Sequence, residues 1–223
     1  MGAWSYSSLT KYDTCPRQYY EVKIAKRFVD EENEQSRWGS DVHEAIEHHF
    51  KEGTPIPQRM NAFVPTVQKV KDHVFGSGGE FAVEIELGVD QTLTEARGFN
   101  DEDCYARGII DLLQIKGSKA LNLDWKTGKI KDSNQLRMSS GLIFANFPQV
   151  EVVHAGYVWL PVNQITREIW RREDNVWSVF DPILRNLEWS RQHDAWPPKP
   201  SGLCKGWCSV KSCEYWQAKR IKR

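Results

Sequence analysis

Two aspartates and a lysine on adjacent predicted strands are the residues whose types and spacing could perform chemistry. Asp111 ends the segment GIID at 108–111, and Asp124 and Lys126 lie two residues apart in the apolar segment 121–126. Residues i and i+2 of a strand point to the same face, so Asp124 and Lys126 project together. Paired carboxylates that hold a divalent cation, with an amine beside them, are suited to hydrolysing phosphodiester bonds. Metal-dependent phosphodiester cleavage is therefore the first chemistry to test.

The same residues also have a simpler interpretation. Asp124 and Lys126 could form a same-face ion pair that contributes little to stability. Asp111 could be an acid at a strand end that accepts hydrogen bonds from the backbone. Glu84 and Glu86 share a face of the preceding predicted strand, where they could add a carboxylate to the site or simply face solvent.

Bulk charge gives no argument for a nucleic-acid partner. The chain of 223 residues has 30 basic and 30 acidic side chains and a formal net charge of zero. Any positive electrostatic potential that attracts DNA must therefore come from a local cluster of basic side chains. The candidates are the tail 219–223 and the set Arg167, Arg171 and Arg172, and a solvated charged face explains both equally well.

The apolar pattern predicts a cytoplasmic protein. No apolar stretch approaches the length that spans a bilayer. The first residues lack the basic and then apolar layout of a signal peptide. In the cytoplasm, the five cysteines are expected to be thiols or metal ligands rather than disulfides.

The order of predicted elements indicates an α/β fold with a mixed sheet flanked by helices. Helices are expected at 7–24 with an interruption at Pro16, at 38–52 with Ser40 as N-cap, and at 62–75, 134–147 and 181–196. Strands are expected at 81–87, 104–116, 120–126, 151–160 and 165–171, with a hairpin turn at 117–118.

Five motifs in a fixed order give the chain a resemblance to a known family. They are the segment 7–20, Gly39 with His43, the segment GIID, the segment DWKTG at 124–128, and Gln135. With these motifs the chain resembles a RecB-type nuclease of the PD-(D/E)XK superfamily. This group includes nuclease domains of bacterial recombination complexes and the CRISPR-associated exonucleases. The resemblance implies a restriction-endonuclease-like fold in one domain, 1–223. That domain would comprise a helical part (1–60), a nuclease core (80–196) and a cysteine-rich segment (197–223).

The resemblance also implies roles for the site residues. His43, Asp111 and Asp124 would bind Mg²⁺ or Mn²⁺ with help from the carbonyl of Trp125. Lys126 would orient the attacking water or stabilise charge on the phosphate. Gln135 would lie near the site. The family often places a tyrosine four residues after that glutamine, to stack on DNA, but this chain has Ser139 there.

Four cysteines at the two ends of the chain form a second candidate site. Cys204, Cys208 and Cys213 form a C-x3-C-x4-C cluster, and Cys15 is the natural fourth ligand because it would close a loop of nearly the whole chain. The resemblance implies a [4Fe–4S] cluster, and a structural Zn²⁺ satisfies the same ligand set. Cys104 is expected to be a core residue.

The function predicted from these motifs is a metal-dependent DNA exonuclease. It would act on single-stranded DNA or on DNA ends during recombination, replication or DNA processing. Two alternatives remain: a non-catalytic DNA-binding subunit of a larger complex, and a structure-selective endonuclease. The resemblance admits recombination, replication or CRISPR partner proteins and a bacterial or phage-encoded origin. Exposed aromatic residues such as Tyr12, Tyr19, Trp207 and Trp216 could stack on bases, although core packing explains each of them as well.

Overall fold

The computed structural model describes residues 3–130 and 134–218, which form two compact units. Unit 1 comprises Asn33–Ser178 together with Ala3, and it contains the sheet and the acidic residues of the predicted site. Unit 2 comprises Trp4–Glu32 and the described residues from Val179 onward, and it contains four of the five cysteines. The division of a single domain at 60, 80 and 196 stays a prediction.

Unit 1 has a mixed α/β fold. Its α-helices are α3 (Glu34–Glu52), α4 (Val64–Ser77) and α5 (Gln135–Asn146). Its strands are β1 (Glu80–Val89), β2 (Ala96–Arg97), β3 (Ala106–Lys116), β4 (Lys119–Lys126), β5 (Val152–Trp159), β6 (Gln164–Ile165) and β7 (Glu168–Arg171). Short 3-10 helices cover Gln58–Phe63 and Leu160–Val162, and a third, Ser178–Phe180, begins at the end of the unit. The predicted strand 165–171 is divided between β6 and β7.

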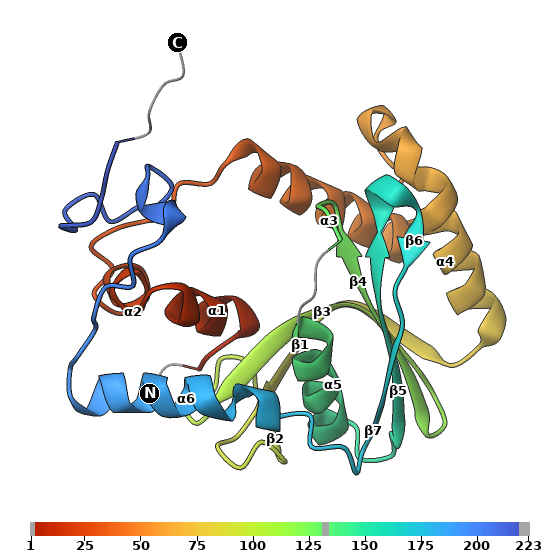
Figure 1. The fold of residues 1–223 in the computed structure, drawn as a ribbon. Helices are drawn as coiled ribbons and strands as arrows, with labels where there is room; N and C mark the ends of the chain where they lie inside the picture. Colours follow the sequence, from red (N-terminus) through yellow and green to blue (C-terminus); the bar gives the residue numbers. More distant parts are fainter. Residues whose placement is uncertain (1–2, 131–133, 219–223) are drawn as a thin grey trace. The chain divides into compact units, whose positions relative to one another are not determined.

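The seven strands form one mixed sheet in the order β2-β1-β3-β4-β5-β6, and β7 also pairs with β5 (Figure 1). β1, β3 and β4 are antiparallel neighbours, and the turn between β3 and β4 lies at the predicted position. β4 and β5 run parallel, so α5 serves as the crossover between them. The two central strands that carry the predicted acids are therefore direct neighbours.

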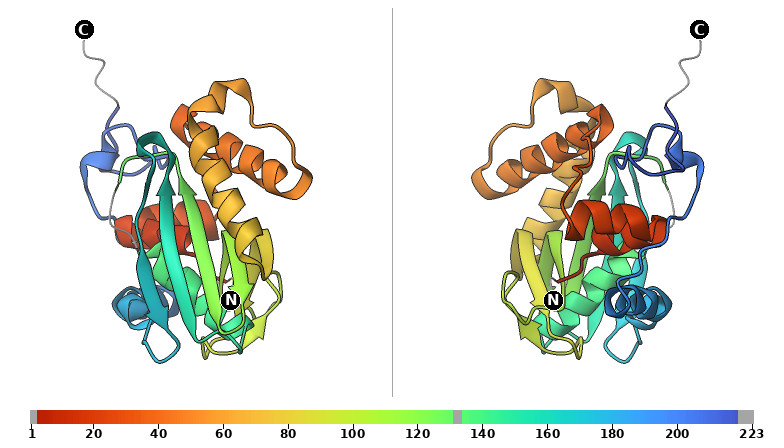
Figure 2. Two further views of the ribbon diagram at one scale, coloured as in Figure 1. Left: turned by 90° about the vertical axis from the view of Figure 1, so that its right-hand side faces the viewer. Right: turned by 90° about the vertical axis from the view of Figure 1, so that its left-hand side faces the viewer.

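Helices cover both faces of the sheet, as Figure 2 shows. α3 and α4 pack on one face, where their apolar side chains form a core with Leu112, Leu123, Trp125 and Val158. α5 lies on the opposite face, where Ser139 accepts a hydrogen bond of 2.6 Å from the amide of Asn122 on β4. The alternation along β4 thus sends Leu123 and Trp125 towards α3 and α4, and Asn122 towards α5.

Helix α3 begins six residues before the predicted N-cap. Asn33 is the N-cap, because its side chain accepts a hydrogen bond of 2.8 Å from the backbone N–H of Ser36. Ser40 lies inside the helix, where its hydroxyl donates to the carbonyl of Ser36. The prediction of Ser40 as the cap was wrong because both residues are good N-caps, and the polar first turn gave no apolar periodicity to favour the earlier one.

Unit 2 contains α1 (Tyr6–Thr14), α2 (Pro16–Tyr19), a π-helical turn (Tyr20–Ile24), α6 (Asp181–Gln192) and a 3-10 turn (Gly202–Cys204). Trp196 lies against Tyr12, Tyr19 and Tyr20, with ring centroids 5.2–6.4 Å apart. Tyr12 and Tyr19 are therefore buried core residues, whereas Trp207 is 62% exposed. Of Tyr12, Tyr19 and Trp207, only Trp207 has an exposed side chain.

The helices of the described residues include none that combines the length and the apolar character needed to cross a membrane.

Candidate active site

Three acids lie in one row across three strands of unit 1: the predicted Asp111 and Asp124, with Glu84 in addition. The β3–β4 register pairs Leu112 with Leu123, which places Asp111 opposite Asp124. Asp111 Oδ2 also accepts a hydrogen bond of 2.8 Å from the backbone N–H of Trp125. The β1–β3 register likewise places Glu84 opposite Asp111. Three carboxyl groups therefore lie on neighbouring strands, an arrangement that costs free energy unless a cation or a proton offsets it.

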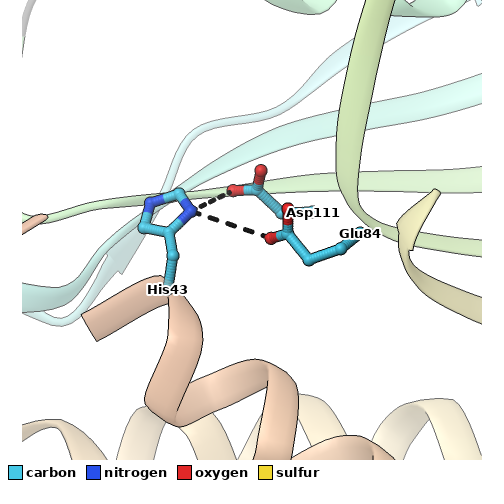
Figure 3. Close-up of side chains that lie close together, drawn as sticks. All are labelled: His43, Glu84 and Asp111. Carbon is cyan, nitrogen blue, oxygen red and sulfur yellow. Dashed lines mark ion pairs between the residues drawn. The ribbon is translucent and has the colours of Figure 1, made fainter. Parts of the chain in front are cut away.

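His43 reaches this row from α3, as Figure 3 shows. Its Nε2 lies 2.9 Å from the carbonyl oxygen of Trp125, and its Nδ1 lies 3.3 Å from Asp111 Oδ2 and 3.9 Å from Glu84 Oε1. Because a carbonyl only accepts, Nε2 is the nitrogen that donates. In the neutral ring, Nδ1 then turns a lone pair towards two carboxyl groups. This geometry fits a cation held between them.

The ligand atoms of His43, Glu84 and Asp111 all lie within 4.8 Å of one another. In the described part of the chain they form the one such group of three. The sequence alone does not single out Glu84 as a ligand, because an exposed strand face explains this residue equally well. The feature that distinguishes Glu84 is its backbone conformation, which only the structure shows: its φ is 53° inside β1. A non-glycine residue held in this left-handed region stores strain, which is typical of functional sites.

Asp124, Lys126 and Gln135 form a connected polar chain beside this group. Gln135, the first residue of α5, donates through Nε2 to Asp124 Oδ1 at 2.7 Å and accepts from Lys126 Nζ at 2.9 Å. Lys126 Nζ also lies 2.5 Å from Asp124 Oδ2. One amide therefore fixes both the acid and the amine. The structure places Gln135 beside the two residues, as the resemblance implied.

Tyr157 supports this polar chain from β5. The Lys126 ammonium lies 5.3 Å from the centre of its ring, and its hydroxyl accepts a hydrogen bond of 3.2 Å from the backbone N–H of Leu136. The sequence identified Tyr157 only as part of a buried strand. Ser139, where the family often has tyrosine, is buried against Asn122 and is not available for stacking on DNA.

The buried acids have raised pKa values. Burial is the main cause for Asp111, and the charges of Asp124 and Glu84 raise its pKa further, to well above the usual range. Burial also raises the pKa of Asp124, although Lys126 opposes the shift. The pKa of Glu84 is raised by burial and then by the charge of Glu47, and burial lowers the pKa of His43. Without a cation, the site thus favours neutral groups.

The donor set fits a hard divalent cation. Carboxylate oxygens are the ligands that Mg²⁺ and Mn²⁺ prefer, and an imidazole suits manganese better than magnesium. The predicted ligands His43 and Asp111 lie together, with Glu84 in addition. Asp124 faces Lys126 and Gln135. The carbonyl of Trp125 is the partner of His43 Nε2, so its role as a ligand stays a prediction.

Four cysteines of unit 2 line one pocket. Cys15 lies between α1 and α2, and Cys204, Cys208 and Cys213 lie in the segment after α6. Two backbone N–H groups point at sulfur atoms at 3.4 Å, that of Lys199 at Cys15 and that of Ser201 at Cys204. Among the described residues no three of the sulfur atoms lie within 4.8 Å of one another. Cys104 is buried in unit 1, as predicted.

The basic set at 167–172 is divided in the structure. Arg172 donates to the backbone carbonyls of Phe144, Phe147 and Val150, so its guanidinium holds the backbone of these residues. Arg167 and Arg171 are exposed. The basic tail 219–223 lies outside the described residues.

Comparison with known proteins identifies the family to which this chain belongs. A model of the PD-(D/E)XK nuclease superfamily matches residues 3–215. No curated protein gives a significant match. A solved structure from Eubacterium rectale, described as a candidate exonuclease, is similar with a TM-score of 0.50 and 12% identity over 99% of this chain and 89% of that one. The structure of SSO0001 gives a TM-score of 0.46 and 13% identity over 98% and 89% of the two chains. The match of the family model over nearly the whole length, together with the row of acids and the lysine beside it, places the chain in the PD-(D/E)XK nuclease superfamily.

Proposed function

We propose that this nuclease is a metal-dependent deoxyribonuclease that digests single-stranded DNA or DNA from free ends. The observation that supports the proposal most directly is the convergence of His43, Glu84 and Asp111 next to Asp124 and Lys126. Binding a phosphate alone would not require several carboxyl groups beside the backbone of the substrate. The candidate exonuclease from Eubacterium rectale is similar to this chain in fold alone. The choice of exonuclease over endonuclease therefore rests on the motif resemblance.

The residues can be given separate roles. Mg²⁺ or Mn²⁺ held by His43, Glu84, Asp111 and Asp124 would supply Lewis-acid activation of the phosphodiester and a water of lowered pKa. Lys126 orients the attacking water or stabilises the negative charge that develops on the phosphate. Gln135 is a positioning residue, because it holds the Asp124 carboxyl and the Lys126 ammonium through one amide.

The test is digestion of labelled DNA by the full chain with and without Mg²⁺ or Mn²⁺. We expect Lys126→Ala to lower the cleavage rate roughly 100- to 1,000-fold, as loss of a transition-state donor does. Lys119→Ala at the other end of β4 is the matched control, since this exposed lysine is outside the site. Metal-dependent cleavage that survives Lys126→Ala would contradict the assignment.

Linear and circular DNA substrates distinguish an exonuclease from the two alternatives, an endonuclease and a non-catalytic subunit. Loss of label from linear strands, with circular strands left intact, supports an exonuclease. Cutting of circular DNA at junctions or flaps would instead identify a structure-selective endonuclease. Binding of DNA without any metal-dependent hydrolysis would favour the non-catalytic subunit, and only this last outcome overturns the enzymatic proposal itself.

We further propose that the four cysteines of unit 2 hold a [4Fe–4S] cluster. The donor set fits, because four thiols line one pocket and backbone N–H groups point at two of them, which stabilises thiolate ligands. A tetrahedral zinc site with bonds of about 2.3 Å brings every pair of sulfur atoms to about 3.8 Å. In the part of the chain that the structure describes, no three of the sulfur atoms lie within 4.8 Å of one another, which does not match this zinc geometry. The role of the [4Fe–4S] cluster would be to tie α1 and α2 to the C-terminal segment.

Purification without oxygen tests the cluster. We expect brown protein with visible absorption and about four iron atoms per chain, both lost in Cys204→Ser. Cys104→Ser, which changes a cysteine outside the pocket, should keep its iron. One zinc atom and no iron per chain would assign the site to zinc instead.

A further inference from the structure

A pocket on the α4 side of the sheet belongs to none of the sites above. It has a volume of about 550 Å³ and lies in unit 1 between α4 and the strands β4 to β7. Its apolar floor comes from four residues with large side chains, Leu121, Leu123, Ile165 and Ile169, and from Gly156 between them. Lys69, His73, His154 and Arg167 line it as well.

This pocket opens on the face of the sheet opposite to α5. Leu121 and Leu123 alternate with Asn122 and Asp124 along β4, so the two pairs of side chains point to opposite faces. Leu123 packs with α3 and α4, whereas Asn122 bonds to Ser139 on α5. A ligand in the pocket is therefore separated by the sheet from the Asp124–Lys126 pair.

A glycine lies in the middle of this face, where the carbonyl of Thr166 approaches the strand too closely for a side chain. Gly156 pairs with Leu123 on β4, and the register of β5 with β6 and β7 places Arg167 opposite Gly156 on the other side. The row Leu123–Gly156–Arg167 thus has no side chain at its centre. The larger neighbours Ile165 and Ile169 line the pocket beside Gly156.

The four basic side chains have no partner of their own. Lys69 and His73 lie one turn apart on α4, and His154 and Arg167 come from β5 and the β6–β7 connection. None of the four makes an ion pair or a hydrogen bond with any residue that the structure describes. Glu168 also lines the pocket, but its carboxylate accepts a hydrogen bond of 3.1 Å from the indole of Trp170.

We propose that this pocket binds a small organic anion with an apolar body. Sites for small molecules have volumes of about 300–1,000 Å³, with an apolar lining and a few polar groups at set positions. The floor would receive an alkyl or aromatic body, and Arg167 and Lys69 would pair with a carboxylate, sulfonate or phosphate. The unsatisfied positive charge selects an anion over a neutral or cationic ligand.

The fluorescent aromatic sulfonate 1-anilinonaphthalene-8-sulfonate is a suitable probe of the full chain. We expect saturable binding that weakens about tenfold in the double variant Lys69→Gln with Arg167→Gln, since loss of a charged contact is worth about that much. Arg185→Gln is the matched control, because it removes an exposed arginine in unit 2. The Tm of the wild type, the double variant and Arg185→Gln should be the same, because the altered side chains are exposed and make no hydrogen bond or ion pair with the described residues.

Competition identifies the apolar body of the ligand. Displacement by decanoate assigns an alkyl chain to the floor, and displacement by thymidine monophosphate assigns a planar base. Both outcomes support the anion site if the double variant weakens them. Equal probe affinity in the double variant and in Arg185→Gln overturns the proposal. Displacement by single-stranded oligonucleotide but by neither small anion also overturns it, and reassigns the surface to nucleic acid.

Discussion

Glu84 and Asp111 lie opposite each other on β1 and β3, although both are acids and Glu84 adopts a left-handed backbone conformation. Like charges that face each other across a sheet destabilise it, and a left-handed non-glycine residue adds about 1–3 kcal/mol of strain. His43 Nδ1 lies within 4 Å of a carboxylate oxygen of each. The arrangement is unfavourable for the protein alone and favourable around a cation, which is the physical reason to expect a metal site here.

At a pH above the raised pKa of Asp111, Asp111→Asn should stabilise the metal-free protein by about 1 kcal/mol, because it removes one charge from the buried row. The raised pKa of Asp111, caused mainly by burial, means that the folded state holds its proton more tightly than the unfolded state. Stability is therefore lost as pH rises from about 4, the ordinary aspartate pKa, through the raised value. Urea unfolding in EDTA at several pH values measures this.

The same variant should abolish the stabilisation by metal. Mn²⁺ should raise the Tm of the wild type and leave that of Asp111→Asn nearly unchanged, because a cation that binds only the folded state stabilises it by mass action. Equal Mn²⁺ shifts in the two proteins would exclude Asp111 from the cation site.

Gln135→Ala should lower kcat about tenfold and change KM for DNA little, since the residue aligns Asp124 and Lys126 without a predicted contact to substrate. Gln135→Glu should be worse, because a carboxylate would then face Asp124. Gln68→Ala, which removes an exposed glutamine of α4 bonded to Asp72, is the control. Steady-state digestion of labelled DNA distinguishes these effects, and a change confined to KM would place Gln135 in substrate binding instead.

Tyr157→Phe should cost about 1–2 kcal/mol of stability and lower kcat severalfold, because the backbone N–H of Leu136 loses its partner and the start of α5 carries Gln135. The matched control is Tyr12→Phe, which removes another buried hydroxyl, bonded to Ser190 in unit 2. Both variants should unfold at lower urea concentration, and only the first should be slower in digestion. Equal kcat in the two would reduce Tyr157 to a structural role.

Gly156→Ala should destabilise unit 1 by about 1–3 kcal/mol, since a Cβ there would lie 2.6 Å from the carbonyl oxygen of Thr166. Gly76→Ala, in α4 with no atom within 4 Å of the added Cβ, should be neutral or stabilising. Thermal unfolding of the two variants compares the effects. A tolerated Gly156→Ala would show that the β6–β7 connection can move away from β5.

The sequence by itself determined the order of the main helices and strands, and it placed Asp111 and Asp124 on neighbouring strands. Strand alternation in 121–126 correctly separated Leu123 from Asp124, because the side-chain period of a strand is a local property of the backbone. The order of five short motifs was enough to indicate the superfamily, which the family model confirms. The start of α3 was misplaced because helix caps are chosen between competing polar residues of similar strength.

Only the tertiary structure decided which residues join the acids. Glu84 looked like an exposed strand acid until the β1–β3 register placed it opposite Asp111. Tyr157 and Leu136 are 21 residues apart, and their hydrogen bond exists only because β5 lies parallel to β4 with α5 across it. The same pairing places Gly156 in the lining of the pocket beside α4. Contacts between residues distant in sequence depend on strand register and helix packing, which no local pattern of residues encodes.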